Sequence, residues 1–150
     1  MREVFLAELV FPGVSRSVST ARHCVGHVLT MAGHLDVSGA QLVVSELVGN
    51  AVIHTISGLP GGLVAVDITA IGDDLARIDV IDGGSATVPR MREPTETDPR
   101  GRGLRIVEEM AVRWGVRGDA CGGTAVWAEV LTVESTPAGA ADLSVCNMAS

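Results

Sequence analysis

The sequence predicts an α+β fold, a two-layer α/β sandwich with helices on one face of a mixed, largely antiparallel sheet. Its 150 residues fit one domain, which can bury a full core without disulfides or metal. Apolar residues make up 47% of the chain and charged residues 19%, the balance of a globular protein. Helical and strand patterns interleave, and neighbouring strand patterns are joined by short turns, which favours antiparallel pairing.

The first strand and the first helix are marked by breakers and by periodicity. Residues 3–11 form an apolar run that a Pro-Gly pair ends, so we expect a strand. Ser15 or Ser17 then suits the cap of a helix with apolar residues at three- and four-residue spacing up to about Ala32. Gly33 follows where a helix typically terminates.

The middle of the chain predicts a second helix and a hairpin. The helix opens at Ser38, which forms a capping-box pattern with Gln41, and runs to about Ile56. Two β-rich runs, 63–71 and 75–82, are separated by a Gly-Asp-Asp turn. We therefore expect these two strands to pair with each other.

The last third begins with a long polar loop, residues 83–101, of a length usual for functional lids. A third helix is expected from Arg102 to about Arg113, and a final pair of strands over residues 114–118 and 124–133.

The chain end differs from the rest in composition. Residues 134–150 are small and polar, which predicts a flexible tail after one domain spanning residues 1–133. No run approaches the ~20 apolar residues of a membrane span. Glu3 and Glu8 interrupt the N-terminal apolar run, which speaks against a secretory signal. We expect a cytoplasmic protein with no membrane partner.

Charge excludes several function classes. The net charge is −7, which argues against a surface that binds nucleic acid by neutralising phosphates. All 11 basic residues are arginine. Without lysine, the chain cannot be a Schiff-base enzyme, a P-loop NTPase or a eukaryotic-type protein kinase. Any ATP chemistry must use another scaffold.

Cysteines and histidines give no strong metal signal. Cys24, Cys121 and Cys146 are too far apart for a zinc or redox motif. His23 and His27 have the four-residue spacing of a helical metal site, but no third ligand lies close in sequence. We interpret them as ordinary histidines.

The second helix carries a polar stripe on an otherwise apolar surface. Glu46, Asn50 and His54 recur at intervals of four and therefore stack along one side of the helix. A buried carboxylate without a partner costs several kcal/mol, so the stripe must face water, a partner or a ligand cavity. A plain solvent-facing side is the alternative.

Asp82 ends the apolar face of its strand, directly before two glycines. Alternation puts it on the same face as Val80, and the following Gly83 and Gly84 allow close approach by a ligand. An inward carboxylate suits a donor such as an exocyclic amine. The alternative is a turn aspartate that caps its own backbone. Thr124 similarly falls on an apolar strand face.

A segment rich in glycine and arginine precedes the third helix. Free N–H groups at a helix start, together with glycines and arginines, form an anion site without lysine. A flexible hinge is the alternative. The residues of this segment are Arg100, Gly101, Arg102, Gly103 and Leu104.

The order of these motifs resembles the GHKL ATPase superfamily, whose domains have the Bergerat ATP-binding fold. The likeness runs from about residue 5 to residue 131 through ELVGNAVIH, IDVIDGG, a long polar loop, GRGLRIVEEMA and GGTAVW. Within the superfamily, the chain is most similar to the small stand-alone anti-sigma-factor serine kinases of actinobacterial type. The opening FPGVSRSVSTARHCV and the pairing of SELVGNA with GRGL are typical of that branch.

The resemblance implies roles for the helical stripe. Asn50 matches the residue that holds Mg²⁺, and Glu46 matches the general base that acts on a serine hydroxyl or a water. His54 matches a basic position that contacts phosphate. A carboxylate four residues before an amide puts base and metal ligand on one helical face.

The resemblance also implies a site for ATP. Asp82 matches the adenine-binding aspartate, with Gly84 supporting the base and Thr124 fixing adenine through water. Gly101 and Gly103 match the glycines around the phosphates. The implied cofactors are therefore ATP and Mg²⁺.

Two functions of different classes follow from the resemblance. The first is a serine/threonine kinase that phosphorylates an anti-anti-sigma partner and also sequesters a sigma factor. The second is a nucleotide-dependent interaction module without significant catalysis. Relatives of this branch often form homodimers, and the apolar strand 3–11 suits edge pairing with a second copy.

Overall fold

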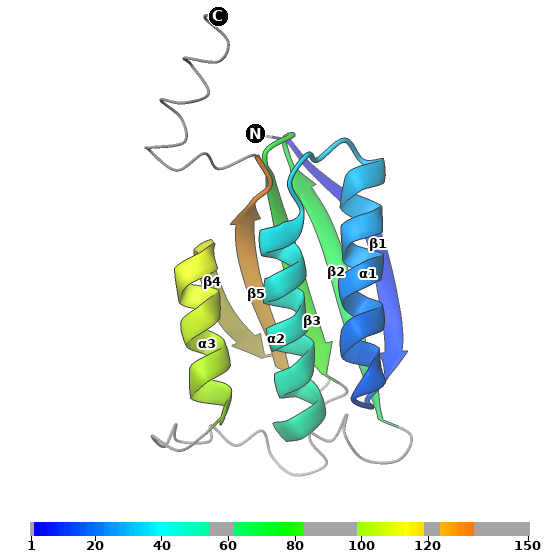
Figure 1. Ribbon diagram of the computed structural model, residues 1–150, viewed down its shortest axis with the longest axis vertical. Helices are drawn as coiled ribbons and strands as arrows, with labels where there is room; N and C mark the ends of the chain where they lie inside the picture. Colours follow the sequence, from blue (N-terminus) through cyan, green and yellow to red (C-terminus); the bar gives the residue numbers. More distant parts are fainter. Residues whose placement is uncertain (1, 55–61, 83–98, 119–123, 134–150) are drawn as a thin grey trace, which may run out of the picture.

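The computed structural model describes residues 2–54, 62–82, 99–118 and 124–133 (Figure 1). Within these ranges it contains three helices and five strands. In chain order they are β1 (Glu3–Pro12), α1 (Arg16–Met31), α2 (Ser38–His54), β2 (Leu63–Ile71), β3 (Leu75–Asp82), α3 (Pro99–Met110), β4 (Ala111–Gly118) and β5 (Thr124–Leu131).

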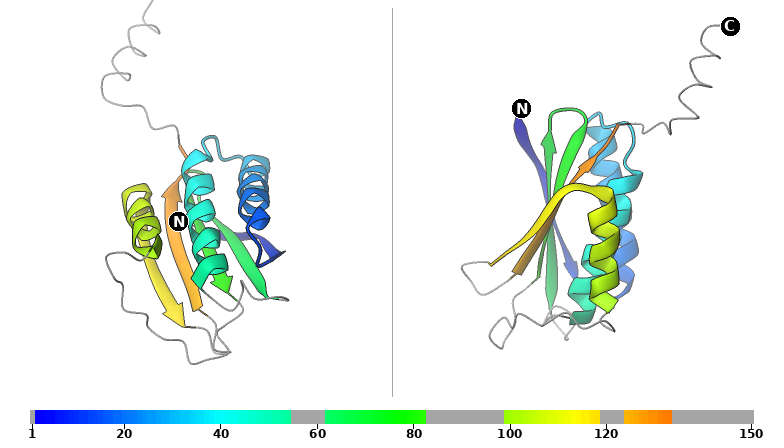
Figure 2. Two further views of the ribbon diagram at one scale, coloured as in Figure 1. Left: turned by 60° about the horizontal axis from the view of Figure 1, so that its bottom comes forward. Right: turned by 90° about the vertical axis from the view of Figure 1, so that its left-hand side faces the viewer.

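The elements form two layers, with the helices side by side on one face of the sheet (Figure 2). The strand order is β1-β2-β3-β5-β4. Each described pair of neighbours is antiparallel. The predicted α+β sandwich is confirmed, and the sheet is antiparallel in all four of these pairings rather than mixed.

The core lies between the layers, and α2 is its centre. This helix packs against α1, α3, β3 and β5. Val44 and Val48 are fully buried in α2 and face sheet residues such as Ile78 in the same core cluster. Each such side chain stabilises the fold by about 1.5–3 kcal/mol. A helix that is apolar almost all round therefore takes the middle position.

The start of α1 differs from the predicted cap. Ser15 occupies the cap position, but its side chain makes no capping hydrogen bond. The Ser17 hydroxyl instead donates to the Pro12 carbonyl oxygen at 2.6 Å, which ties the helix to the end of β1. The predicted helix end is confirmed, because Gly33 has φ 97°, a conformation that glycine adopts without strain.

The capping box predicted for α2 is wrong. Asp36 caps this helix: its Oδ1 accepts from the Ser38 amide at 3.0 Å and from the Ser38 hydroxyl at 2.6 Å. These bonds lower the pKa of Asp36. The side-chain Nε2 of Gln41 donates to the backbone carbonyl oxygen of Arg22 in α1 at 3.2 Å. It can do so because Gly26 leaves room where a Cβ would collide with the Gln41 side chain.

The hairpin 63–71/75–82 forms as predicted, with Gly72 at φ 65° in its turn. The third helix begins at Pro99 and ends at Met110, three residues before the predicted bounds at each end. Proline suits a first helical position, and the chain enters β4 directly at Ala111. Hydrophobic periodicity did not predict the end of α3, because pairing of β4 with β5 fixes where the helix stops.

Other boundaries differ little. The first strand extends to Pro12, and the last strand ends at Leu131 rather than at residue 133. Ile56, most of the loop 83–101 and the tail 134–150 lie outside the described residues. None of the described helices has the length and hydropathy needed to cross a bilayer.

Candidate functional site

Four elements that carry predicted site residues meet at one end of the molecule, the lower end in Figure 1. There α2 ends at His54, β3 ends at Asp82, α3 begins at Pro99 and β5 begins at Thr124. Because β3 and β5 are antiparallel neighbours, the last residue of one lies beside the first residue of the other. Because α2 also packs against α3 and β3, the four elements lie next to one another at this end.

Asp82 lies at this end on the helix-covered side of the sheet. Ile78 and Val80 are buried on the same face of β3, and Asp82 is half-buried. Its Oδ1 accepts from the backbone N–H of Thr124 at 3.3 Å. This bond reaches from β3 to β5, so the neighbouring strand helps to orient the carboxylate. Gly84 lies outside the described residues.

The stripe on α2 is only partly exposed. Glu46 and Asn50 are both half-buried, whereas Ile53 is 65% exposed and marks a side of the helix that faces solvent. The Asn50 amide nitrogen has neither solvent contact nor a hydrogen-bond partner in the described structure. Burying an unpaired amide costs about 1–3 kcal/mol. A plain solvent-facing side therefore does not describe Asn50.

The glycine-arginine segment forms the first turns of α3. The sequence places it before the helix, but the helix backbone already begins at Pro99, so Arg100, Gly101 and Arg102 are helical. The first four N–H groups of a helix have no acceptor within it, and the segment still presents such donors. The structure describes the backbone but not the side chains of residues 100–103 or of His54.

Leu104 has a packing position. It is half-buried and lies against the core cluster, where Val107 of the same helix is fully buried. The Leu104 side chain therefore anchors α3 to the core directly after the glycine-arginine segment. A direct contact of Leu104 with a ligand is not needed to explain its position.

The donor types at this end suit a nucleotide with Mg²⁺. A carboxylate and an amide on one helix supply the oxygen ligands that Mg²⁺ prefers. In the described part of the chain, no three His, Cys, Asp or Glu residues are grouped to hold a metal by themselves. Mg²⁺ usually binds through one or two protein groups together with phosphate oxygens, so the amide oxygen of Asn50 suits such a ligand, whereas its unpaired Nδ2 can donate to a phosphate oxygen.

Sequence reasoning missed a second set of polar residues, on the face of the sheet away from the helices. Asp67 and Asp79 are opposite each other on β2 and β3, and Glu8 is opposite Asp67 on β1. The alternation of each strand already places them on the non-core face. Finding the row also requires the strand register, which a single sequence does not provide.

Comparisons with known proteins agree with this geometry. Residues 11–130 match the family described as histidine kinase-like ATPase domain. The anti-sigma F factor of Heyndrickxia coagulans is 34% identical over 110 residues, which cover 67% of this chain and 75% of that protein.

A crystal structure with the same fold contains the RsbU and RsbW domains of a Mycobacterium tuberculosis protein. It matches 90% of this chain with a TM-score of 0.57 and 22% sequence identity. This chain covers only 33% of that longer chain, and at this identity the likeness concerns the fold.

Proposed function

The chain belongs to the histidine kinase-like ATPase domain family, and from this premise we propose that it is an ATP-dependent anti-sigma factor with serine/threonine kinase activity. The similarity to an anti-sigma F factor supports the regulatory role. The proposed partners are a sigma factor, which the chain sequesters, and an anti-anti-sigma protein, which it phosphorylates. Such partners act in the cytoplasm, so we propose that location as well.

The observation that carries the proposal is the buried amide of Asn50 on the same side of α2 as Glu46. Asn50 Nδ2 lies out of solvent without a described partner, one helical turn from a half-buried carboxylate. A bound ligand that offers an acceptor to Nδ2, such as a phosphate oxygen, removes the cost of this unpaired donor. Asp82 lies at the same end of the molecule, at the end of β3.

Each group has a distinct proposed task. Glu46 accepts the proton of a serine or threonine hydroxyl as that oxygen takes the γ-phosphoryl group, and ADP leaves. Asn50 would hold Mg²⁺, which when bound offsets the charge of the phosphates. The N–H groups at the start of α3 donate to phosphate oxygens. His54 contacts phosphate from the end of α2.

Asp82 is the proposed group for base selection. Its carboxylate accepts from the exocyclic amine of adenine, and Thr124 supports the base from β5. The hydrogen bond from the Thr124 amide holds the carboxylate in place before the nucleotide arrives. Gly84 supports the base from the segment after β3.

Substitution of Glu46 tests the kinase proposal. We expect Glu46→Gln to lower phosphoryl transfer from labelled ATP to a purified anti-anti-sigma protein by at least about 100-fold, since base catalysis contributes 10²–10⁴-fold. ATP affinity should stay unchanged, because the amide preserves shape. Glu109→Gln, on the exposed side of α3, is the matched control. Transfer at the wild-type rate by Glu46→Gln contradicts the role of Glu46.

A further variant, Asp82→Asn, separates a kinase from a binding module. A module without catalysis is the conclusion if Asp82→Asn loses partner binding while no phosphorylated partner forms even with the wild type.

Homodimer formation is a further part of the proposal, because β1 is an edge strand in the described sheet with Val4 and Val10 exposed. Sedimentation of the full chain tests it.

A further inference from the structure

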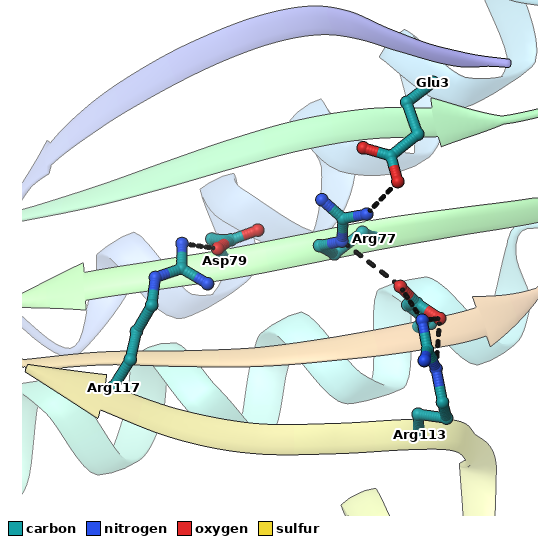
Figure 3. A network of polar contacts seen from close by, with 6 residues as sticks. Glu3, Arg77, Asp79, Arg113 and Arg117 are labelled. Carbon is teal, nitrogen blue, oxygen red and sulfur yellow. Dashed lines mark hydrogen bonds and ion pairs between the residues drawn. The ribbon is translucent and has the colours of Figure 1, made fainter.

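One face of the sheet carries none of the three described helices and is called here the open face (Figure 2). Buried acidic side chains on this face are matched by arginines. Glu129 of β5 is 3% exposed and binds Arg113 at 2.8 Å and Arg77 at 3.3 Å. Asp79 of β3 is 5% exposed and pairs with Arg117 (Figure 3). A buried carboxylate is tolerated when a guanidinium compensates its charge.

Asp67 does not follow this pattern. It lies on β2 between Glu8 of β1 and Asp79 of β3, so carboxylates from three strands form one row. Asp67 Oδ1 has no solvent contact and no hydrogen-bond partner among the described residues. Burial raises the pKa of Asp67, and the nearby charges of Glu8 and Asp79, together with a side-chain hydrogen bond to Glu8, raise it further. The charge of Arg117, which is paired with Asp79, lowers the pKa of Asp67 and so offsets part of this rise.

Exposed apolar residues surround Asp67 on the open face. Phe5 and Val10 flank Glu8 along β1 and are 60% and 54% exposed. The register places them opposite Thr69 and Ala65, so they point to the open face as Glu8 does. Leu63, at the start of β2, is 53% exposed. We call these residues the acidic patch: Phe5, Glu8, Val10, Leu63 and Asp67.

We propose that the acidic patch binds a partner protein that inserts an arginine between Glu8 and Asp67 and places apolar side chains on Phe5 and Val10. The guanidinium completes for Asp67 the arrangement that Glu129 and Asp79 already have. Arginine fits because its planar fork can bind two carboxylate oxygens. Apolar neighbours exclude water around the pair and strengthen it.

Charge favours a separate partner over a second copy of this chain. The arginines of the open face, Arg77, Arg113 and Arg117, are each engaged by an acidic group of their own chain. A second copy that packed through its own open face would have to break one of these pairs to supply a cation. A metal ion is also a poor occupant, since no group of potential ligands suited to a metal occurs in the described residues.

Amide chemical shifts of the full isotope-labelled chain test the proposal. The probe is a short blocked peptide of alternating valine and arginine, and the matched control peptide carries citrulline in place of arginine. Citrulline keeps the shape and removes the charge. We expect saturable shifts at Glu8, Asp67 and their neighbours with the arginine peptide, and at least about tenfold weaker binding of the citrulline peptide.

Variants of the chain locate the site. Asp67→Asn and Glu8→Gln should each weaken binding of the arginine peptide by about tenfold. Glu3→Gln is the control, because this carboxylate is on the same strand but outside the patch and pairs with Arg77 at 2.7 Å. Glu8 is exposed, so Glu8→Gln should fold normally. The test therefore remains informative even if Asp67→Asn fails to fold.

Three results would overturn the proposal. The first is the lack of saturable shifts with the arginine peptide, and the second is equal binding of the arginine and citrulline peptides. The third is a change of sedimentation in Asp67→Asn from dimer to monomer, which would identify a second copy as the occupant. None of these results depends on nucleotide binding.

Discussion

Asp79 and Asp82 are close together on β3 but serve different faces of the sheet. Asp79 points to the open face, is 5% exposed and is paired with the guanidinium of Arg117. Asp82 lies on the helix-covered side at the strand end, half-buried, and accepts from the backbone amide of Thr124. The chain compensates one carboxylate with a cation and orients the other with a neutral donor.

The two faces of the sheet differ in the same way. On the covered side, apolar side chains pack into a core that positions Asp82 and α2 at one end. On the open side, arginines and carboxylates link strands that are distant in sequence, as in the contact of Arg77 with Glu3 and Glu129. We therefore assign stability to the covered face, nucleotide binding to its end, and partner recognition to the open face.

The largest expected effect distinguishes the two faces by stability. Ile78→Ala should lower the free energy of unfolding by about 3–4 kcal/mol, because Ile78 is fully buried and its loss leaves a cavity. Arg77→Ala, one position earlier on the open face, should cost only about 1 kcal/mol. Urea denaturation measures both. Equal costs would remove the distinction between a packing face and a charged face.

The next effect distinguishes the two aspartates by function. Asp82→Asn should weaken ATP binding by about 100-fold, or ~2.7 kcal/mol, because an amide presents a donor where adenine also presents one. Asp79→Asn should leave ATP affinity unchanged, since Asp79 faces away from the helices. Calorimetric titration measures both. Loss of ATP binding in Asp79→Asn alone would contradict the assignment.

A smaller effect is expected from removing the guanidinium of Arg117, which pairs with Asp79. Arg117→Leu should lower the free energy of unfolding by about 1 kcal/mol, because it leaves a buried carboxylate without its cation. The cost stays small because Arg117 is 55% exposed and water takes part of its place. The loss should shrink in high salt, which screens the pair in the wild type. A salt-independent loss would point to packing instead.

The smallest effect is a pH dependence that comes from Asp67. Its folded-state pKa lies above its ordinary value of 3.8, so the folded chain holds a proton that the unfolded chain has lost. Stability therefore falls as pH rises from 3.8 through the raised pKa, and the loss persists at neutral pH.

Asp67→Asn should accordingly stabilise the chain at neutral pH by less than about 1 kcal/mol, with no gain below pH 3.8. Thermal melts of both proteins across this pH range check the prediction. The opposite sign, a variant less stable at neutral pH, would mean that Asp67 is compensated in the folded chain.

Local signals predicted the elements that local forces determine. The hairpin formed with its predicted bounds because strand alternation and the Gly72 turn are both encoded within it. The caps were wrong because Ser17 and Asp36 take partners outside the predicted patterns. The helix α3 ends earlier than predicted because pairing of β4 with β5 begins at Ala111.

The candidate site was predictable in part. Helical spacing placed Glu46 and Asn50 on one side of α2, and strand alternation placed Asp82 at the covered end. Their proximity to Thr124 and α3 depends on strand order, which the resemblance supplied and periodicity did not. The row of Glu8, Asp67 and Asp79 was missed because it depends on register across three strands.

Titration of nucleotides into the full wild-type chain tests the central claim most directly. The claim is that this end of the molecule binds Mg-ATP and that Asp82 reads the adenine amine. Calorimetry should show saturable binding of Mg-ATP and at least about 100-fold weaker binding of Mg-GTP, because guanine presents a carbonyl where adenine presents the amine. Equal affinity for both nucleotides, or no binding of Mg-ATP by a folded chain, would contradict it.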